Sequence, residues 1–360
     1  MATITTRTLL FLYCSTQALG LSQEAANLAR GRIFEAVSSP SGKLTISPEL
    51  VIPDPSDPTA ILLQTNAINT LSGRIRTAKA NAAWITGGVS AISTFAGEQE
   101  AARGGFPGPV PLIFCGNTNN DDIAALAEAG ASGVTVPVCG GTELTSLEDL
   151  SGEWTSICQT CVDAGIQPIP EVTLAGALAE NLGEDDVESL VEQLSTAAGM
   201  DPVAVLLTMN PLASDNEDDE DDDSRDEPVP LPSIPKKLGK KIPILGSVRV
   251  TAGQNRLTTE SQRLKQAGFT GVVLRSDCVP GFRLNPDLDV VGLFWAAVIG
   301  ELKSTRSKSF EFNSRNNMEK SMGAEWAKYQ TNVIESGALG DPNDSYSVVD
   351  DSVGEYKGFA

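Results

Sequence analysis

Short runs of Val, Ile and Leu recur along the chain, and each is followed by a polar or glycine-containing turn and then by a segment with helical spacing of its apolar residues. This alternation is typical of parallel βα units, in which the strands are buried on both faces and the helices on one. The predicted strands cover residues 59–65, 81–87, 111–116, 132–138, 166–173, 202–210, 242–250 and 271–276.

Eight units in succession predict a closed (β/α)8 barrel rather than an open doubly wound sheet. An open sheet that binds a dinucleotide would carry a glycine-rich turn after its first strand, and the segment QTNAINT contains no glycine. The barrel is expected to span residues 21–304. A helix over residues 23–37 precedes the first strand and is expected either to cap the barrel floor or to cover its mouth.

Charges and glycines indicate the limits of several helices. Asp121 and Asp122 place negative charge at the start of one predicted helix, and Gly130 provides its C-terminal stop, as Gly268 does before the eighth strand. A closing amphipathic helix is expected within residues 286–305. The side chains expected to pack back on the sheet are Leu293, Trp295, Ala296, Ile299 and Leu302.

The negative charge of the chain is concentrated in one insertion. The formal net charge is −21, and a dense run of Asp and Glu lies between the sixth and seventh predicted strands. Residues 214–241 are expected to form a solvated, disordered loop at the C-terminal rim, because like charges repel one another and the following prolines oppose a helix. This loop could contact a protein partner, bind a cation or pair with the lysines at its C-terminal end. The acidic balance argues against nucleic acid and anionic membranes as partners.

Both ends of the chain are expected to lie outside the barrel. Residues 1–20 combine Arg7, an apolar run, and small residues at Ala18 and Gly20, which is the pattern of a cleaved targeting segment. The pattern resembles the bipartite plastid presequences of algae with secondary plastids and implies the chloroplast stroma, with a cytoplasmic location as the alternative. Residues 305–360 lose apolar periodicity and are expected to form a partly helical and then disordered tail.

The residue types limit the chemistry. The chain contains no histidine, which excludes Ser-His-Asp and Cys-His nucleophiles, HExxH metal sites and histidine-ligated haem. The six cysteines lack the spacing of a disulfide framework, and Cys158 and Cys161 lie inside a helical segment with no second CxxC for a zinc site. Packed, reduced thiols are the favoured interpretation, and redox or metal use is the alternative. We expect no cofactor and no bound metal.

Three stretches of the chain resemble units of indole-3-glycerol-phosphate synthase and related aldolase-type barrels of the ribulose-phosphate-binding group. They are RLKQAGFTGVVLRSDCV, PLIFCGNTNNDDIAALAEAGASGVTVPV and IPEVTL. The resemblance covers residues 23 to 303 and implies a (β/α)8 fold. It also implies the reaction of that family, a ring closure with loss of carbon dioxide and water. That reaction uses a lysine acid, carboxylate bases and a phosphate-binding turn near the last strands.

Only some of the residues implied by this resemblance are present. Glu171 falls on the carboxylate of the fifth strand and is the candidate catalytic residue. The lysine position of the third strand falls on Phe114 or Cys115, and the asparagine of the sixth strand corresponds to Asn210 with a shift. The family's general acid therefore has no counterpart in the third unit.

The other units depart from the family as well. The seventh-strand glutamate should lie within residues 246–250, which contain no acid, and the first unit offers Gln64 and Asn66 in place of a glutamate and a lysine. The glycine-serine turn after the eighth strand is replaced by Arg-Ser-Asp at residues 275–277. These coordinated losses indicate a barrel that has given up the chemistry of the family.

Two arginines at adjacent strand ends provide a candidate ligand site. The guanidinium groups of Arg249 and Arg275 could hold a phosphate or a carboxylate bidentately. The alternative is that Arg275 pairs with Asp277 or Glu171 in a structural salt bridge. The residues expected to assist a ligand are Ser276, Asn117, Asn210, Gly140 and Gly141.

Three functional hypotheses remain. The first is a non-catalytic or repurposed plastid barrel that binds a small phosphorylated or carboxylated ligand. The second is a divergent carboxy-lyase or aldolase-type enzyme that uses Glu171 with an arginine as electrophile. The third is a structural subunit of a plastid complex that docks through the acidic loop or the tail. Convergence of Glu171, Arg249 and Arg275 on one open cavity would favour a ligand site, and a packed mouth would favour the structural role.

Overall fold

The computed structural model of the chain describes ten segments, and all structural statements below concern them. The predicted targeting segment, the predicted tail and the acidic run itself lie outside these segments. The described residues are 26–38, 43–53, 60–116, 120–138, 153–174, 179, 181–209, 231–249, 256–276 and 287–303.

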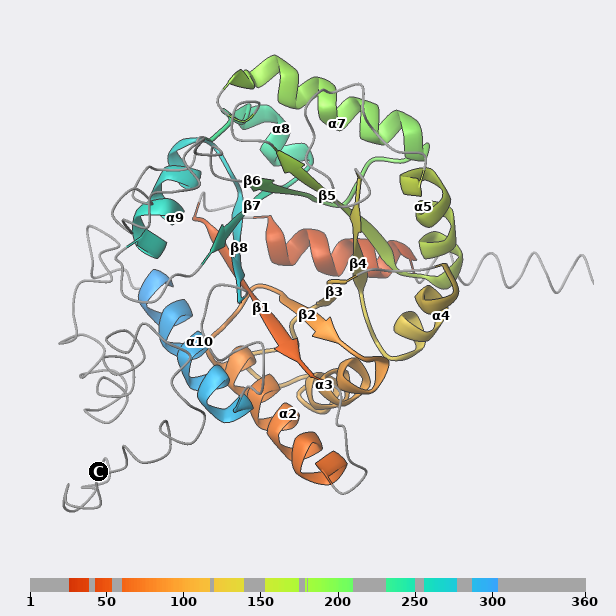
Figure 1. The fold of residues 1–360 in the computed structure, drawn as a ribbon, viewed down its shortest axis with the longest axis vertical. Coiled ribbons are helices and arrows are strands. Elements are labelled where there is room, and N and C mark those ends of the chain that lie inside the picture. Colours follow the sequence, from red (N-terminus) through yellow and green to blue (C-terminus); the bar gives the residue numbers. More distant parts are fainter. Residues whose placement is uncertain are drawn as a thin grey trace, which may run out of the picture.

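Eight parallel strands form a closed barrel in sequence order, and the last strand pairs with the first to complete it (Figure 1). The predicted (β/α)8 fold is therefore confirmed. Each strand pairs with the next through a parallel register, as expected where a helix connects successive strands. The strands are β1 (Thr45–Ile52), β2 (Ala83–Gly87), β3 (Leu112–Phe114), β4 (Gly133–Pro137), β5 (Gln167–Leu174), β6 (Val205–Met209), β7 (Ile244–Arg249) and β8 (Gly271–Arg275).

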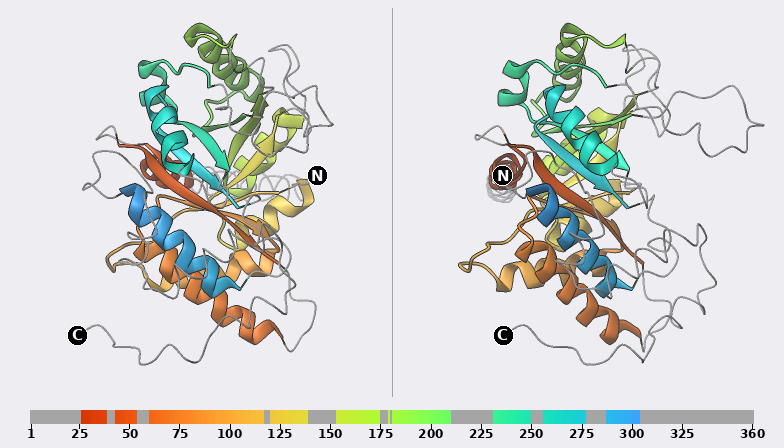
Figure 2. Two further views of the ribbon diagram at one scale, coloured as in Figure 1. Left: turned by 60° about the vertical axis from the view of Figure 1, so that its left-hand side comes forward. Right: turned by 90° about the vertical axis from the view of Figure 1, so that its left-hand side faces the viewer.

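Helices surround the ring of strands (Figure 1). The last helix lies beside the first helix that follows β1, so the outer layer closes where the sheet closes (Figure 2). No helix within the described segments is both long and apolar enough to cross a bilayer. The labelled helices are α2 (Ala60–Thr77), α3 (Val89–Ala101), α4 (Asn120–Glu128), α5 (Glu153–Ala164), α7 (Glu184–Ala198), α8 (Lys236–Lys241), α9 (Arg256–Gln266) and α10 (Leu288–Lys303).

The first strand lies earlier than predicted. Residues 60–65, which were expected to form the first strand, belong to helix α2, and β1 is the segment TISPELVI. The helix buries Ile68, Leu71 and Ile75, which have helical spacing, while Leu63 is 74% exposed. The other seven predicted strands overlap β2 to β8.

The helix of residues 26–37 closes the floor of the barrel, which decides between the two expected positions. Its side chains Ile33 and Val37 are fully buried in the barrel interior. Gln167, the first residue of β5, donates a hydrogen bond to the carbonyl of Ala26 at 2.8 Å, and Thr45, the first residue of β1, donates one to the carbonyl of Val37 at 3.2 Å. The mouth at the carboxyl ends of the strands is therefore the opposite end.

The middle of the barrel is a packed apolar layer and not a channel. Large side chains from six of the strands fill it, as in other eight-stranded barrels. All of them are 1% exposed or less. They are Trp84, Ile113, Ile169, Leu206, Leu245 and Val273.

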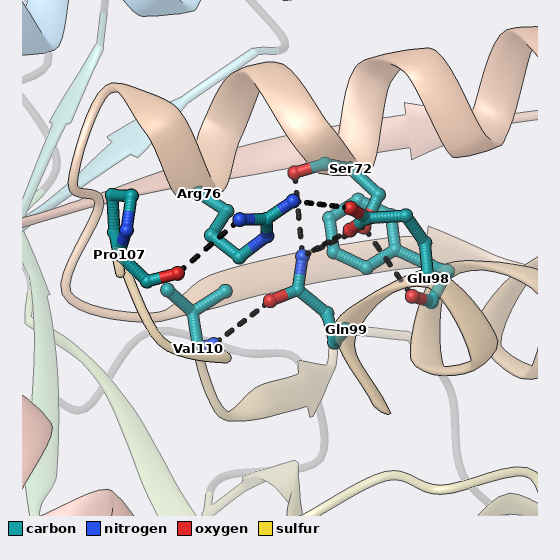
Figure 3. A network of polar contacts seen from close by, with 7 residues as sticks. Ser72, Arg76, Glu98, Gln99, Pro107 and Val110 are labelled. Carbon is teal, nitrogen blue, oxygen red and sulfur yellow. Dashed lines mark hydrogen bonds and ion pairs between the residues drawn. The ribbon is translucent and has the colours of Figure 1, made fainter. Parts of the chain in front are cut away.

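A buried polar network joins helices α2 and α3 (Figure 3). Glu98 accepts hydrogen bonds from Arg76 Nη2 at 2.6 Å and from Ser72 Oγ at 2.7 Å. Gln99 donates to Ser72 Oγ at 2.7 Å, and its Oε1 accepts a bond from the backbone N–H of Val110 at 2.9 Å. The network fixes the two helices and the segment before β3 to one another, because these hydrogen bonds link side chains of α2 to side chains of α3 and one α3 side chain to the backbone of Val110.

Two further expectations need correction. Leu293 of the closing helix α10 is 39% exposed and does not pack on the sheet, because it lies on the opposite face from Trp295, Ile299 and Leu302. Residues 236–241, expected within a disordered loop, form the short helix α8, in which Leu238 is 7% exposed and anchors the helix to the barrel. The expected helix stops are confirmed: Gly130 and Gly268 have φ angles of 98° and 96°.

Candidate ligand site at the barrel mouth

The interior of the barrel becomes polar toward the carboxyl ends of the strands. Side chains two residues apart in a strand point to the same face, so the residue that follows an interior apolar residue by two positions lies above it. Five polar residues lie in this upper layer: Glu49 on β1, Thr86 on β2, Glu171 on β5, Thr208 on β6 and Arg275 on β8. Four of them come two positions after a large apolar residue of the middle layer, and Glu49 comes two positions after Ser47.

Arg275 joins these residues across the mouth. Its Nη2 donates to Glu171 Oε1 in a close ion pair, and its Nη1 lies 3.4 Å from Glu49 Oε1. Thr208 Oγ1 lies 3.4 Å from Nη2 and donates to Glu171 Oε1 at 3.2 Å. The predicted ion pair between Arg275 and Glu171 is therefore present, and a second carboxylate takes part in it.

Glu49 is held by its own set of donors. Thr86 Oγ1 donates to Glu49 Oε1 at 3.3 Å, and the backbone N–H of Ser276 donates to Glu49 Oε2 at 3.2 Å. The hydrogen bonds from β2 and from the end of β8 fix the carboxylate toward Arg275. Glu49 thus belongs to the site as fully as Glu171 does.

Sequence reasoning missed Glu49 because it placed the first strand at the wrong residues. Gln64 and Asn66, expected at the first strand end, lie on helix α2, where the side chain of Gln64 donates to the carbonyl of Pro53. The first unit does carry a glutamate, so the expected loss of that carboxylate is wrong. The alternation of Thr45, Ser47 and Glu49 with buried Ile46 and Leu50 was the signal that could have identified it.

The charged groups of the site are largely shielded from water. The side chains of Glu49, Arg275 and Glu171 are 11%, 13% and 17% exposed. At such positions charges interact more strongly than in bulk water, and removing one partner of an ion pair leaves a costly charge behind. The residual exposure means that solvent still reaches all three side chains.

Cys115 lies in the interior close to these charges and is 4% exposed. Burial raises the pKa of its thiol well above the usual value, and the nearby Arg275 only partly offsets this effect. The thiol therefore stays protonated, and a protonated thiol is a poor nucleophile. Burial also raises the pKa of Cys158 and of Cys161 to about 12, which agrees with packed thiols inside α5.

The remaining predicted site residues are only partly described. Arg249 ends β7 and is paired in register with Arg275, but its side chain lies outside the described parts of the chain. The side chain of Ser276 is 1% exposed, and its Oγ has no hydrogen-bond partner among the described residues. No group of three potential metal ligands occurs within the described segments. The residues that lie outside those segments are Asn117, Gly140, Gly141, Asn210 and Asp277.

Comparisons with known proteins provide no family. No family model and no curated protein matches the chain. Among solved structures, it is similar to a native KDPGal structure, with 14% identity and a TM-score of 0.38 over 71% of this chain and 97% of that one. Triosephosphate isomerase from Bartonella henselae gives 14% identity and a TM-score of 0.38, with 70% and 99% of the two chains covered.

A third similar structure is the carboxyl transferase domain of Rhizobium etli pyruvate carboxylase with 3-bromopyruvate. Its identity is 11% and its TM-score 0.43, with 87% of this chain and 57% of that chain covered. Likenesses this weak carry no argument about family, ligand or reaction. The barrel fold itself follows from the closed eight-stranded sheet.

Proposed function

We propose that the chain is a repurposed (β/α)8 barrel that binds a small ligand through a phosphate or carboxylate group at its mouth. In this proposal it does not perform the reaction of indole-3-glycerol-phosphate synthase, which parts of its sequence resemble. The observation that carries the proposal is Arg275, a guanidinium fixed at the barrel mouth and still 13% exposed.

The surroundings of Arg275 support a binding role. A guanidinium recognises carboxylates and phosphates through a planar fork of N–H groups, and it binds best when its orientation is already fixed. Glu49 and Glu171 fix it from two sides of the barrel. Arg249 ends the neighbouring strand β7 and is paired in register with Arg275.

The absence of lysine and histidine from the strands supports a non-catalytic role. The eight strands contain no lysine, the whole sequence between Lys79 and Lys236 contains none, and the chain has no histidine. Cys115 is the thiol beside the charged groups, and burial keeps it protonated. A missing general acid or base costs about 10²–10⁴-fold in rate for each group, so the family reaction would be strongly impaired.

The proposal is tested by measuring the thermal stability of the full chain, and then the heat of binding, with inorganic phosphate, a triose phosphate, a pentose phosphate and small carboxylic acids at millimolar concentration. At least one anion should stabilise the wild-type protein. Arg275→Gln should abolish that stabilisation. The matched control is Arg103→Gln, because Arg103 is 65% exposed and pairs with Glu100 at the protein surface.

The outcome is decisive in either direction. Stabilisation that depends on Arg275 and not on Arg103 supports the ligand site. If none of these anions stabilises the wild-type protein, or if Arg275→Gln binds them as well as the wild type does, the proposed function is wrong.

The divergent lyase remains a second candidate, because two carboxylates and a guanidinium meet at the mouth. A carboxylate could accept a proton while the guanidinium stabilises a developing anion. Glu171→Gln would then abolish a turnover that metabolite profiling of cells detects. Unchanged metabolite levels in that variant, with the protein folded and present, would remove this candidate.

We also propose that the protein acts in a plastid, on the sequence pattern of residues 1–20. Fusion of these residues to a fluorescent protein should direct it to plastids. A fluorescent protein that stays in the cytoplasm would contradict the location without affecting the proposed ligand site.

A further inference from the structure

The charges described at the barrel mouth do not balance. Glu49 and Glu171 both contact Arg275, so two carboxylates share one guanidinium. All three side chains are at most 17% exposed, and water screens their interactions only partly. A ligand that brings negative charge alone would add to this excess, whereas a ligand that also brings a positive charge would compensate it.

We infer that the ligand carries an ammonium group next to its anionic group, as a free amino acid does. This inference rests on the proposed function, because it specifies the class of molecule that the same site takes. The carboxylate of the amino acid faces Arg275, and its ammonium group lies against Glu171 or Glu49. Both charges of the ligand then meet an opposite charge in a partly dehydrated site.

The hydrogen bonds of Glu171 leave a place for the ammonium group. An ionised carboxylate offers about four acceptor positions on its two oxygens. The bonds from Thr208 Oγ1 and Arg275 Nη2 both end on Glu171 Oε1. Glu171 Oε2 is therefore the oxygen that we assign to the ligand's N–H groups.

Ser276 provides a second, independent observation. Its backbone N–H donates to Glu49 Oε2 at 3.2 Å, while its side chain is 1% exposed and its Oγ lacks a hydrogen-bond partner within the described segments. Buried hydroxyl groups normally have a partner, so an unpaired one at the end of β8 indicates a polar atom that is bound there in the functional state.

The inference is tested on the full chain with three matched series. They are the common L-amino acids, the 2-hydroxy acids in which a hydroxyl replaces the ammonium group, and the primary amines that lack the carboxylate. Isothermal titration calorimetry should detect binding of at least one amino acid. Its hydroxy acid and its amine should each bind roughly 10- to 100-fold more weakly, which is the usual effect of losing a charged hydrogen-bonded pair.

Variants assign the ammonium position. Glu171→Gln keeps the shape of the side chain and removes its charge, so it should weaken amino-acid binding by about tenfold or more and reduce the preference over the hydroxy acid. Glu188→Gln on the exposed surface of α7 is the matched control and should leave both affinities unchanged. Circular dichroism verifies that each variant is folded. If Glu171→Gln does not fold, Glu49→Gln replaces it, and the ligand series on the wild type is decisive without either variant.

The failures of the two proposals can be distinguished. If the hydroxy acid or a sugar phosphate binds as tightly as the amino acid, the ammonium inference is wrong and the anion site stands. If amines bind as tightly as amino acids, the carboxylate has no role and both proposals are wrong. If none of the amino acids, hydroxy acids, amines and phosphates binds, the ligand site itself is wrong and the inference falls with it.

Discussion

Arg275 and Glu171 form an ion pair across the barrel mouth although 104 residues separate them in the sequence. They lie on β8 and β5, strands that are not neighbours in the sheet. Glu49 reaches the same guanidinium from β1. The contact therefore joins three parts of the barrel, and its energy should be measurable in the stability of the whole fold.

Replacing Arg275 by methionine should destabilise the barrel strongly. The change leaves Glu49 and Glu171 without their cation, and solvent only partly stabilises them, since they are 11% and 17% exposed. We expect a loss of roughly 2–3 kcal/mol in the free energy of unfolding, somewhat less than for a fully buried pair. Urea denaturation of the two proteins at neutral pH measures this loss.

The pairing itself is tested by a double-mutant cycle. Glu171→Gln removes one negative charge, so it should cost less in the Arg275→Met background than in the wild type. We expect a coupling energy of about 1–2 kcal/mol between the two positions. Strictly additive effects would show that the contact contributes nothing to stability and that the loss in Arg275→Met has another origin.

The fold could be predicted from the sequence because strands buried on both faces produce apolar runs. Seven strands were found at their correct places in this way. The first strand was missed because β1 has no such apolar run. It alternates apolar residues with Thr45, Ser47 and Glu49, and these polar side chains are buried inside the barrel instead of facing solvent. The apolar run at the start of α2 was predicted to be the first strand instead, because a short apolar run alone does not distinguish a helix from a strand.

The candidate site could be predicted only in part. Arg275 was identified from its position at a strand end and Glu171 from the resemblance of the segment IPEVTL to the fifth unit of a known barrel family, and their pairing was foreseen as one alternative. The role of Glu49 depends on the closure of the barrel, which brings β1 beside β8 and leaves Glu49 next to Ser276. Such a contact arises between residues 227 positions apart, and no local pattern encodes it.

Glu98 should contribute far more to stability than its neighbour Glu100. Glu98→Ala leaves the half-buried Arg76 without its anion and removes the closer of the two acceptors of Ser72 Oγ, so we expect a loss of about 2–3 kcal/mol in the free energy of unfolding. The measurement is urea denaturation at neutral pH.

Glu100→Ala on the same helix is the matched control for this change. Glu100 is 62% exposed and pairs only with the equally exposed Arg103 in the bonds described, so its loss should stay within about 0.5 kcal/mol. Both changes replace a helical glutamate by alanine, and the helix propensity therefore cancels. Equal losses for the two variants would contradict the importance of the network between α2 and α3.

Cys115, Cys158 and Cys161 should resist alkylation in the folded protein. Burial raises the pKa of each thiol, to about 12 for Cys158 and Cys161, and the thiolate is the reactive form. Iodoacetamide treatment at mildly alkaline pH, followed by peptide mass spectrometry, should find these cysteines modified only after unfolding. Modification of Cys158 or Cys161 in the native protein would instead support the alternative of a reactive CxxC pair.

Lys303 at the end of α10 should make the stability of the fold increase at alkaline pH. Its Nζ donates to Asn81 Oδ1 at 2.8 Å and to the carbonyl of Lys79. Burial, assisted by the positive charge of Lys79, lowers the pKa of the Lys303 ammonium group from 10.5 to about 8. The folded state therefore releases this proton more easily than the unfolded state does.

The sign of the effect follows from the protons bound in each state. Below about pH 8 both states carry the charge, and the cost of burying it is fully present. Between about pH 8 and 10.5 the unfolded state binds more protons, so stability rises with pH, and above 10.5 the cost is gone. The Lys303→Met variant lacks this titrating group but keeps the other titratable groups of the wild type. Urea denaturation should therefore show that the free energy of unfolding of the wild type rises relative to that of the variant between about pH 8 and 10.5. Parallel pH profiles of the two proteins would show that Lys303 is not buried as a charge.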